Sequence, residues 1–394
     1  MKLAARAAGL EPSITLTLAA QAKALRAQGH PVIDLTAGEP DFPTPEPIQE
    51  AAREAMRQGY TKYSPAAGFA DLREAVAAKF VRDQKMKVAP EEVLVSNGAK
   101  HAISNLILAL VGPGDRVLIP VPYWLSYPSM VRVAGGEAVL VPPLASDPRR
   151  PDPVAIGKAA CEGARVLILC SPSNPSGAVL SAEEIGAILR GVEKSGCWIL
   201  SDEIYEFLVY DGQRHVSPAE VRPDLRERTI VVSGVSKSYA MTGWRIGYAA
   251  GPRDAIAAAT AIQSHTTSGP NSIAQRAALR ALQMPLSDLA KMREIFQARR
   301  DALCQALGEV PHLRSSRPEG AFYVWTDVRD LVRRTGVAGA DALCQRWLAE
   351  AHVATTPGTA FGAEGFVRFS YAIDEAALRD AGARLRAWAE RAAR

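Results

Sequence analysis

One lysine in this sequence lies where an amine needs an explanation, directly after an apolar run of strand length. The run covers residues 229–232, and Lys237 follows it among small residues that allow close packing. Lysine is rarely buried without a partner. An amine at the end of a core strand is therefore a candidate for covalent or acid–base chemistry.

Polar residues also follow the two β-rich runs that precede this one. Asp202 and Tyr205 come after the run at 197–201, and Asn174 comes after the run at 165–170. In open parallel sheets, ligands bind beyond the carboxyl ends of the strands. The carboxylate, the phenol and the amide are therefore expected to lie near the lysine amine.

An earlier β-rich run leads directly into a helical pattern. Residues 93–95 are followed by Ser-Asn-Gly-Ala-Lys and then by the helix. A strand–turn–helix of this kind presents free backbone N–H groups that can hold a phosphate. Gly98, Ala99 and Lys100 are the candidates for that cradle.

Each feature has an ordinary structural explanation when it is taken alone. Asp202 could cap a helix, Asn174-Pro-Ser-Gly is a common β-turn signal, and Asn97-Gly98 also marks a turn. Together, however, these groups are what pyridoxal phosphate requires. This cofactor needs a lysine for its Schiff base and a carboxylate that keeps its ring nitrogen protonated. Its phosphate needs a helix N-terminus and an arginine.

The composition is that of an ordinary globular protein and argues against several functions. The chain has 394 residues, 48% of them apolar, and its net charge of +4 is too weak to indicate a nucleic-acid partner. No segment has the length of a membrane span, and the N-terminus lacks the apolar core of a signal peptide. The absence of an early G-x-G-x-x-G argues against a nicotinamide dehydrogenase.

The cysteines and histidines indicate neither disulfides nor a metal. The five cysteines are odd in number and form no C-x-x-C pair, and the six histidines show no metal-ligand spacing. We expect buried, reduced thiols in a cytoplasmic protein.

Short β-rich runs alternate with helical patterns through the middle of the chain. This alternation predicts an α/β fold with a mainly parallel seven-stranded sheet covered by helices on both faces. The predicted strands are 92–95, 116–119, 138–141, 165–170, 197–201, 228–232 and 245–249.

The pattern changes beyond Pro285, where a charged helix over 286–307 leads into short strands of a smaller α+β domain. A strand at 32–35 is expected to join this domain. The predicted parts are an N-terminal arm with a small-domain segment (1–45), a large cofactor-binding domain (46–285) and a small C-terminal domain (286–394).

The stretch Ser-Lys-Ser-Tyr-Ala-Met-Thr-Gly-Trp-Arg-Ile-Gly at 236–247 resembles the lysine signature of class I aminotransferases, pyridoxal-phosphate enzymes of fold type I. The whole pattern most resembles the bacterial aspartate aminotransferase subgroup. That resemblance implies transfer of the amino group of L-aspartate to 2-oxoglutarate by a ping-pong mechanism. Other matching motifs, in the family's order, are Ala37–Phe42, Tyr60–Pro65, Pro122–Tyr127, Asn174–Gly177, Asp202–Tyr205 and Arg368–Ser370.

The resemblance implies a role for each residue of the cofactor site. Lys237 would form the Schiff base and act as general base, and Asp202 would pair with the pyridinium nitrogen. Tyr205 and Asn174 would hydrogen-bond the phenolic oxygen. The other residues expected to bind the cofactor are Gly98, Ala99, Lys100, Trp124, Ser236, Arg245 and Tyr63.

Three of these residues carry further expectations. Arg245 would bind the phosphate, and Trp124 would stack on the pyridine ring, although an ordinary core aromatic is the alternative. Tyr63 would reach the phosphate of the neighbouring subunit's cofactor. The last expectation implies a homodimer with active sites at the subunit interface.

The resemblance also implies how the substrate binds. Arg368 would hold the α-carboxylate in a bidentate fork, and Gly38 would leave room for it. Lys100 is the candidate for the distal carboxylate, with help from arm residues such as Ser13. Asn174 and Trp124 would complete the substrate site, and binding would favour closure of the domains.

The sequence departs from the family in two places. Gly234 stands where many members have a phosphate-binding serine, a loss that Ser236 could offset. The segment 264–271 offers no arginine for a distal carboxylate. A lone lysine discriminates less sharply than an arginine fork, so aromatic amino acids or prephenate stay open as substrates. A carbon–sulfur lyase, a cyclopropane-forming synthase and a non-catalytic regulator are further alternatives on this scaffold.

Overall fold

The structure is a computed structural model that describes residues 4–8, 10 and 14–392. Its largest sheet has seven strands in the order β2-β10-β9-β8-β7-β3-β4. The strands are β2 (Val93–Ser96), β3 (Arg116–Pro120), β4 (Glu137–Val141), β7 (Ala164–Cys170), β8 (Trp198–Asp202), β9 (Thr229–Gly234) and β10 (Gly247–Ala250). Strand β10 is antiparallel to both of its neighbours, and the pairs β9-β8-β7-β3-β4 are parallel. The predicted mainly parallel seven-stranded sheet is confirmed.

The last strand of this sheet begins two residues later than predicted, at Gly247 instead of Arg245. A 3-10 turn, Thr242–Trp244, precedes it. Arg245 itself has a left-handed backbone with φ of 57°, which no strand residue adopts. The backbone therefore turns at Arg245 before the strand starts.

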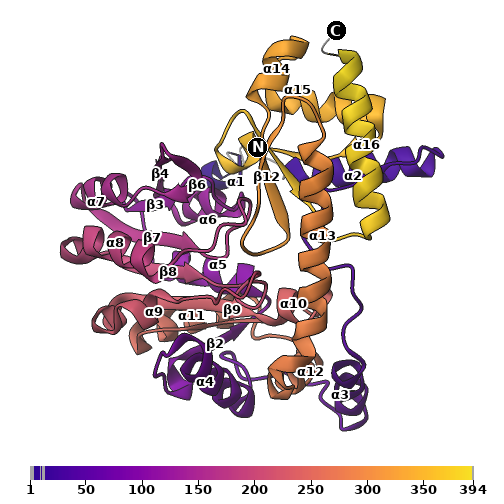
Figure 1. The fold of residues 1–394 in the computed structure, drawn as a ribbon. Coiled ribbons are helices and arrows are strands. Elements are labelled where there is room, and N and C mark those ends of the chain that lie inside the picture. The colour runs from indigo at the N-terminus through magenta and orange to yellow at the C-terminus, as the bar shows by residue number, and fades with distance from the viewer. Residues whose placement is uncertain (1–3, 9, 11–13, 393–394) are drawn as a thin grey trace.

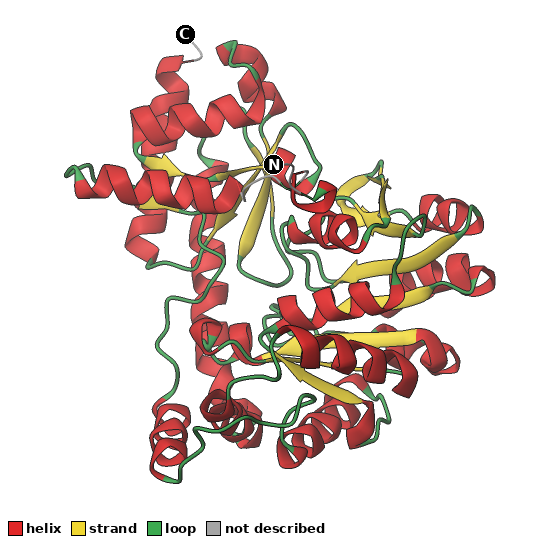
Figure 2. Cartoon of the chain, turned by 180° about the vertical axis from the view of Figure 1, so that it is seen from behind, coloured by secondary structure: helices red, strands yellow, loops and turns green. Residues whose placement is uncertain are grey.

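Apolar side chains cover the sheet on both faces, as in other parallel sheets. On one face, Leu94 and Val117 pack with residues of α5 (Ala99–Leu110). On the other face, Leu118 packs with residues of α7 (Pro153–Cys161) and α8 (Ala182–Val192). Figure 2 shows helices in front of and behind the strands. Packing on both faces holds the strands in place, and the carboxyl ends of the parallel strands therefore lie along one edge of the sheet.

Most of the remaining helices surround the large sheet or lie near its ends, whereas α2 packs against the C-terminal part. Helix α3 packs beside α12 at the lower end of the molecule (Figure 1). A two-stranded hairpin, β5 (Pro143–Leu144) and β6 (Asp147–Pro151), follows β4. The helices are α1 (Ala5–Ala8), α2 (Ile14–Ala27), α3 (Glu46–Arg57), α4 (Ala70–Gln84), α6 (Ser126–Ala134), α9 (Pro218–Val221), α10 (Val235–Ser238), α11 (Arg253–Thr266) and α12 (Ser272–Gln283).

The C-terminal part is built on a four-stranded antiparallel sheet in the order β11-β12-β15-β14. The long helix α13 (Ala290–Gly308) runs along one side of the molecule, from near α12 to the C-terminal part (Figure 1). The predicted helix at 286–307 starts as a 3-10 turn, Leu286–Leu289, with Pro285 at its N-cap. The other elements are β11 (Arg314–Ser316), β12 (Tyr323–Asp327), α14 (Arg329–Thr335), α15 (Gly339–Arg346), a π-helical turn (Trp347–Ala351), β13 (Val353–Ala354), β14 (Thr356–Pro357), β15 (Phe366–Ser370) and α16 (Glu375–Ala392).

The N-terminal strand β1 (Ile33–Asp34) pairs in parallel with β13, not with the large sheet. The backbone N–H of Leu35 also donates to the carbonyl of Ala354 at 2.8 Å. The predicted strand at 32–35 therefore does join the C-terminal part. The domain boundaries at residues 45 and 285 stay a prediction.

The cysteines are all unpaired. Cys197 and Cys344 are buried, and Cys170 and Cys304 are partly buried. Cys161 is exposed at the end of α7, so the expectation of buried thiols holds fully for only two of the five cysteines. Within the described ranges, no helix is both long and apolar enough to span a bilayer.

Candidate active site

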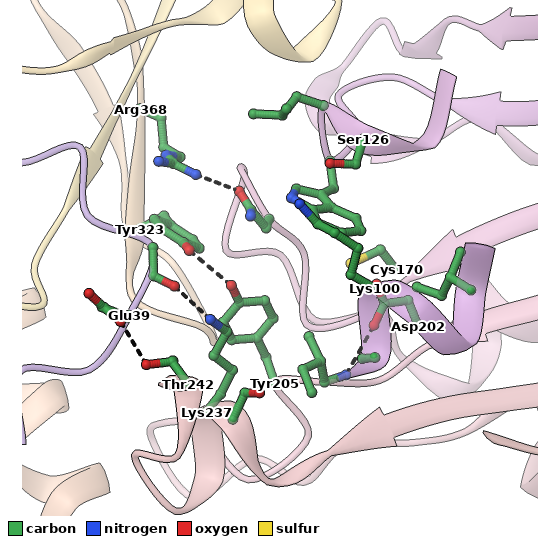
Figure 3. Close-up of a pocket in the computed structure, with 18 of the residues that line it drawn as sticks. Glu39, Lys100, Ser126, Cys170, Asp202, Tyr205, Lys237, Thr242, Tyr323 and Arg368 are labelled. Carbon is green, nitrogen blue, oxygen red and sulfur yellow. Dashed lines mark hydrogen bonds between the residues drawn. The ribbon is translucent and has the colours of Figure 1, made fainter. Parts of the chain in front are cut away.

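A cavity of about 420 Å³ lies where the carboxyl ends of β7, β8 and β9 meet the C-terminal part. These strands are neighbours in the sheet, so Asn174, Asp202 and Lys237 lie close together. Figure 3 shows the side chains that converge there. The predicted site residues that line the cavity are Gly38, Ala99, Lys100, Trp124, Asn174, Asp202, Tyr205, Ser236, Lys237, Arg245 and Arg368.

Two predicted residues in the described part of the chain do not line the cavity. Gly98 lies beside it and contacts Arg245. Tyr63 is 93% exposed and lies outside the cavity of its own chain. Ser13 falls outside the described residues, so the structure gives no account of its role.

Lys237 extends from the short helix α10 into the cavity. Its Nζ donates a hydrogen bond of 2.6 Å to the backbone carbonyl of Gly38 (Figure 3). Burial lowers the pKa of Lys237 to about 8, although the nearby carboxylates of Glu39 and Asp202 favour its protonated form. At physiological pH the amine is therefore mostly protonated but has a sizeable neutral fraction, and that neutral form can accept a proton.

Asp202 ends strand β8 and is only 4% exposed. Its Oδ2 accepts a hydrogen bond of 2.7 Å from the hydroxyl of Tyr127, and its Oδ1 accepts one of 3.3 Å from the backbone of Ile204. Burial raises the pKa of Asp202 to about 6. A buried carboxylate of this kind gains stability from a cationic partner in the cavity.

The predicted phosphate cradle has the geometry that an anion needs. Gly98 begins helix α5 with φ of 88°, and a side chain there would collide with the guanidinium of Arg245. A side chain at Gly247 would overlap the backbone nitrogen of Ala99. The glycines thus let a guanidinium approach the N-terminus of a 12-residue helix, and both features attract a phosphate.

Arg245 is held in this position by two backbone carbonyls. Its Nη1 donates to Thr242 at 2.8 Å and its Nη2 donates to Asn97 at 3.3 Å. Both acceptors are neutral backbone carbonyls, so these bonds orient the guanidinium without neutralising its charge. The positive charge stays available to an anion.

Arg368 comes from strand β15 and is buried on the opposite side of the cavity. Its Nη1 donates to Asn174 Oδ1 at 2.9 Å, and its Nη2 donates to the carbonyl of Thr36 at 2.8 Å. Its planar group lies 4.3 Å from the ring centroid of Tyr323. Among the residues that the structure describes, Arg368 Nε has no hydrogen-bond partner, and burial lowers the pKa of the guanidinium. A carboxylate would satisfy this buried cation.

Tyr205 lies between the lysine and this arginine. Its hydroxyl and that of Tyr323 are 2.9 Å apart, and burial raises the pKa of both phenols. Both therefore stay protonated. One hydroxyl donates to the other, which leaves one O–H of the pair to donate to an oxygen in the cavity.

Lys100 and Trp124 form the outer wall of the cavity. Lys100 Nζ lies 5.0 Å from the ring centroid of Trp124, a cation–π distance. Burial, followed by the charge of Arg245, lowers the pKa of Lys100. His101, the next residue, accepts a hydrogen bond of 3.4 Å at Nδ1 from the backbone of Asn97, so it supports the turn before the helix.

The sequence reasoning missed four residues at the site. Tyr127 holds Asp202, Tyr323 holds Tyr205, and Glu39 is paired with Thr242. Tyr127, Glu39 and Thr242 all lie inside stretches that match the family, so the only available signal was their position in those stretches. The partners themselves depend on the fold.

The departure at Gly234 also has a structural reason. A side chain at this position would come within 2.9 Å of the Cα of Gly247, on the antiparallel neighbour β10. The two glycines allow the strands to approach closely. Ser236 lines the cavity two residues later.

Comparisons with known proteins agree with this geometry. A family model described as aminotransferase class I and II matches residues 30–385. An aspartate aminotransferase of Geobacillus stearothermophilus is 45% identical over 390 residues, 99% of each chain. An aspartate/prephenate aminotransferase of Thermus thermophilus is 44% identical over 382 residues, 96% of each chain. The solved structure of the aspartate aminotransferase from Thermus thermophilus with maleate has a TM-score of 0.93 at 43% identity, covering 98% of this chain and 99% of that one.

The fold and the lysine-centred cavity define an enzyme that transfers amino groups. The chain belongs to the class I and II aminotransferases. Its substrates are accordingly amino acids and 2-oxo acids.

Proposed function

We propose that this enzyme uses pyridoxal phosphate to move the amino group of L-aspartate to 2-oxoglutarate in a ping-pong cycle. The observation that carries the proposal is the placement of two cations, Arg368 and Lys100, in the same cavity as Lys237. One cation suits the α-carboxylate and the other suits a distal carboxylate. The names of the Geobacillus and Thermus relatives, and the dicarboxylate maleate in the Thermus structure, support the same substrate class.

The residues of the cavity fit pyridoxal phosphate. The buried carboxylate of Asp202 suits the pyridinium nitrogen, and the side chain of Trp124 suits the face of the ring. The helix N-terminus at Gly98 and the guanidinium of Arg245 suit the phosphate. When bound, the cofactor supplies an electron sink that stabilises negative charge at the substrate Cα.

The side chains of this chain supply the acid–base chemistry. With a pKa of about 8, Lys237 Nζ can accept the proton that leaves the substrate Cα and return it in the next step. Because Asp202 is buried, its ionised carboxylate is unfavourable without a cationic partner. It therefore stabilises positive charge at the inner end of the cavity. Tyr205 donates a hydrogen bond to the phenolic oxygen and is itself oriented by Tyr323.

The same cavity orients the substrate. Arg368 binds the α-carboxylate, and Asn174 and Thr36 hold the guanidinium in place for it. Gly38 brings backbone to the same end of the site. Lys100 binds the distal carboxylate of aspartate or 2-oxoglutarate. Binding draws the segment of Gly38 and the strand of Arg368 toward the lysine, which is the proposed domain closure.

Broader specificity is the second candidate function. Lys100 is a single point charge, so it selects acidic side chains less sharply than arginine would. The prephenate activity in the name of the Thermus relative adds to this possibility. The lyase alternative is disfavoured because the cavity holds a cation near the expected position of the substrate side chain.

A homodimer completes the proposed enzyme. Among the large hydrophobic side chains of the described residues, Tyr63 is the most exposed, at 93%. Its surface position suits contact with a second copy of the chain, in which it would reach the phosphate site. Dissociation to monomers should then lower cofactor affinity.

A half-reaction tests the proposal. The purified enzyme is saturated with pyridoxal phosphate and mixed with aspartate, phenylalanine, alanine or cysteine in the absence of an oxo acid. Conversion to pyridoxamine phosphate, fastest with aspartate, supports the proposal. Fastest conversion with another amino acid moves the specificity, and release of pyruvate and ammonia without pyridoxamine phosphate replaces transamination with lyase chemistry.

A further inference from the structure

Glu39 is a carboxylate in the cavity for which the sequence motifs predict no role. It lies in the segment between β1 and α3, and it lines the cavity beside Lys237. Its Oε2 accepts a hydrogen bond of 2.6 Å from the hydroxyl of Thr242 (Figure 3). Thr242 follows Lys237 by five residues, so the bond joins the N-terminal segment to the lysine segment.

A second bond joins the same two segments. The carbonyl of Gly38, the residue before Glu39, accepts the 2.6 Å bond from Lys237 Nζ. Thr242 also uses its carbonyl to hold Arg245 of the phosphate cradle, at 2.8 Å. Gly38 therefore contacts the lysine, and Glu39 contacts Thr242, whose carbonyl holds the phosphate-binding arginine.

The charges around Lys237 make Glu39 distinctive. Burial has the largest effect on the pKa of Lys237. Among the charged groups, Glu39 has the largest effect on that pKa. Glu39 and Asp202 favour the protonated amine, whereas Arg245 and Arg368 disfavour it. The rings of Tyr205 and Phe322 lie 6.0 and 5.9 Å from Nζ. Because Asp202 is placed to hold the cofactor ring, Glu39 is the carboxylate left to act on the amine.

We propose that Glu39 is a positioning residue, which Thr242 holds beside Lys237 so that its charge stabilises the ammonium formed when Nζ takes the proton from the substrate Cα. This role rests on the proposed function of Lys237. The proton passes from the Cα to Nζ and later returns, so no other reactant is required. The Thr242 bond keeps the glutamate in the cavity and away from the α-carboxylate site at Arg368.

Four variants separate charge from tethering. Glu39→Gln removes the charge, Thr242→Val removes the tether, and Glu39→Asp keeps the charge on a shorter side chain. Glu294→Gln is the matched control, because Glu294 is an exposed glutamate of α13 that does not line the cavity.

The readout is the titration of Lys237 in the full-length, cofactor-free chain. The chain is labelled briefly with trinitrobenzenesulfonate at a series of pH values, and labelling at Lys237 is measured by peptide mass spectrometry. Because Glu39 favours the protonated amine, Glu39→Gln should lower the labelling midpoint by up to about one pH unit, a change of up to about tenfold in free amine. Thr242→Val should lower it by less, and Glu39→Asp and Glu294→Gln should leave it near the wild-type value.

Turnover separates this role from a purely structural one. In the holoenzyme, Glu39→Gln should lower kcat for aspartate about tenfold, with KM within about twofold, and Glu39→Asp should restore part of kcat. The proposal is wrong if Glu39→Gln has the same labelling midpoint as the wild type and the Glu294→Gln control. A Glu39→Gln enzyme with raised KM and unchanged kcat would also overturn it.

Two further outcomes keep the test decisive. If Glu39→Gln does not fold, Thr242→Val takes its place, and an unchanged midpoint in that variant overturns the proposal. If the midpoints shift as expected but the wild type does not transaminate any amino acid, the proposed function fails while the coupling between Glu39 and Lys237 stands.

Discussion

Asp202→Asn should make the cofactor-free chain more stable at pH 8. Asp202 is almost fully buried, and burial raises its pKa from 3.8 to about 6. Between these values the folded chain keeps a proton that the unfolded chain releases. The free energy of unfolding therefore falls as pH rises through this window, and above pH 6 the penalty is fully present.

The size of the effect follows from the same two values. A difference of about two pH units corresponds to about 3 kcal/mol at 1.36 kcal/mol per unit. Asparagine cannot ionise, and its amide oxygen still accepts the bond from Tyr127, which Asp202 Oδ2 accepts at 2.7 Å. The variant should gain up to about 3 kcal/mol at pH 8 and less than about 1 kcal/mol at pH 4.5.

Urea unfolding of the full-length chain at both pH values measures this gain. Asp288→Asn, at an exposed site, controls for the change in net charge. In the pyridoxal-phosphate form the sign should reverse, because the cofactor then loses the carboxylate that pairs with its ring nitrogen and stabilises the chain less. A cofactor-free Asp202→Asn chain that is less stable than wild type at pH 8 would refute the argument from burial.

Three other substitutions test the division of roles in the cavity. Arg368→Lys keeps the charge but loses one charge-assisted hydrogen bond of about 1.5–3 kcal/mol, so steady-state kinetics should show KM raised about 10- to 150-fold for every amino donor. Lys100→Ala should raise KM for aspartate but not for phenylalanine. Equal effects of both substitutions on the two donors would contradict these roles. Lys237→Ala should abolish the absorbance band of lysine-bound pyridoxal phosphate and nearly all turnover, and an active variant would disprove its assignment.

The amino-acid sequence by itself determined the large sheet and the position of its chemistry. Apolar runs of strand length separated by helical patterns predict parallel strands, and such strands place their carboxyl ends in one row. That rule alone predicted that Asn174, Asp202 and Lys237 would lie together, as the adjacent β7, β8 and β9 place them. These are local patterns combined with a general rule of topology.

The resemblance to a family added what periodicity could not. No local pattern marks Arg368 as a site residue. It lies 131 residues after Lys237, on a strand of the smaller, four-stranded sheet. The stretch around it was assigned only because it matched the family's order of motifs. Its environment confirms that it lines the same cavity, while its role as a carboxylate ligand stays a prediction.

Only the tertiary structure decided which side chains hold these groups in place. Arg368 meets Asn174 across 194 residues of sequence, and Thr242 meets Glu39 across 203. Such pairs leave no periodic signal, because they depend on how one layer packs against another rather than on spacing along the chain. The same packing buries Asp202 and partly encloses Lys237, and this desolvation moves their pKa values toward neutrality.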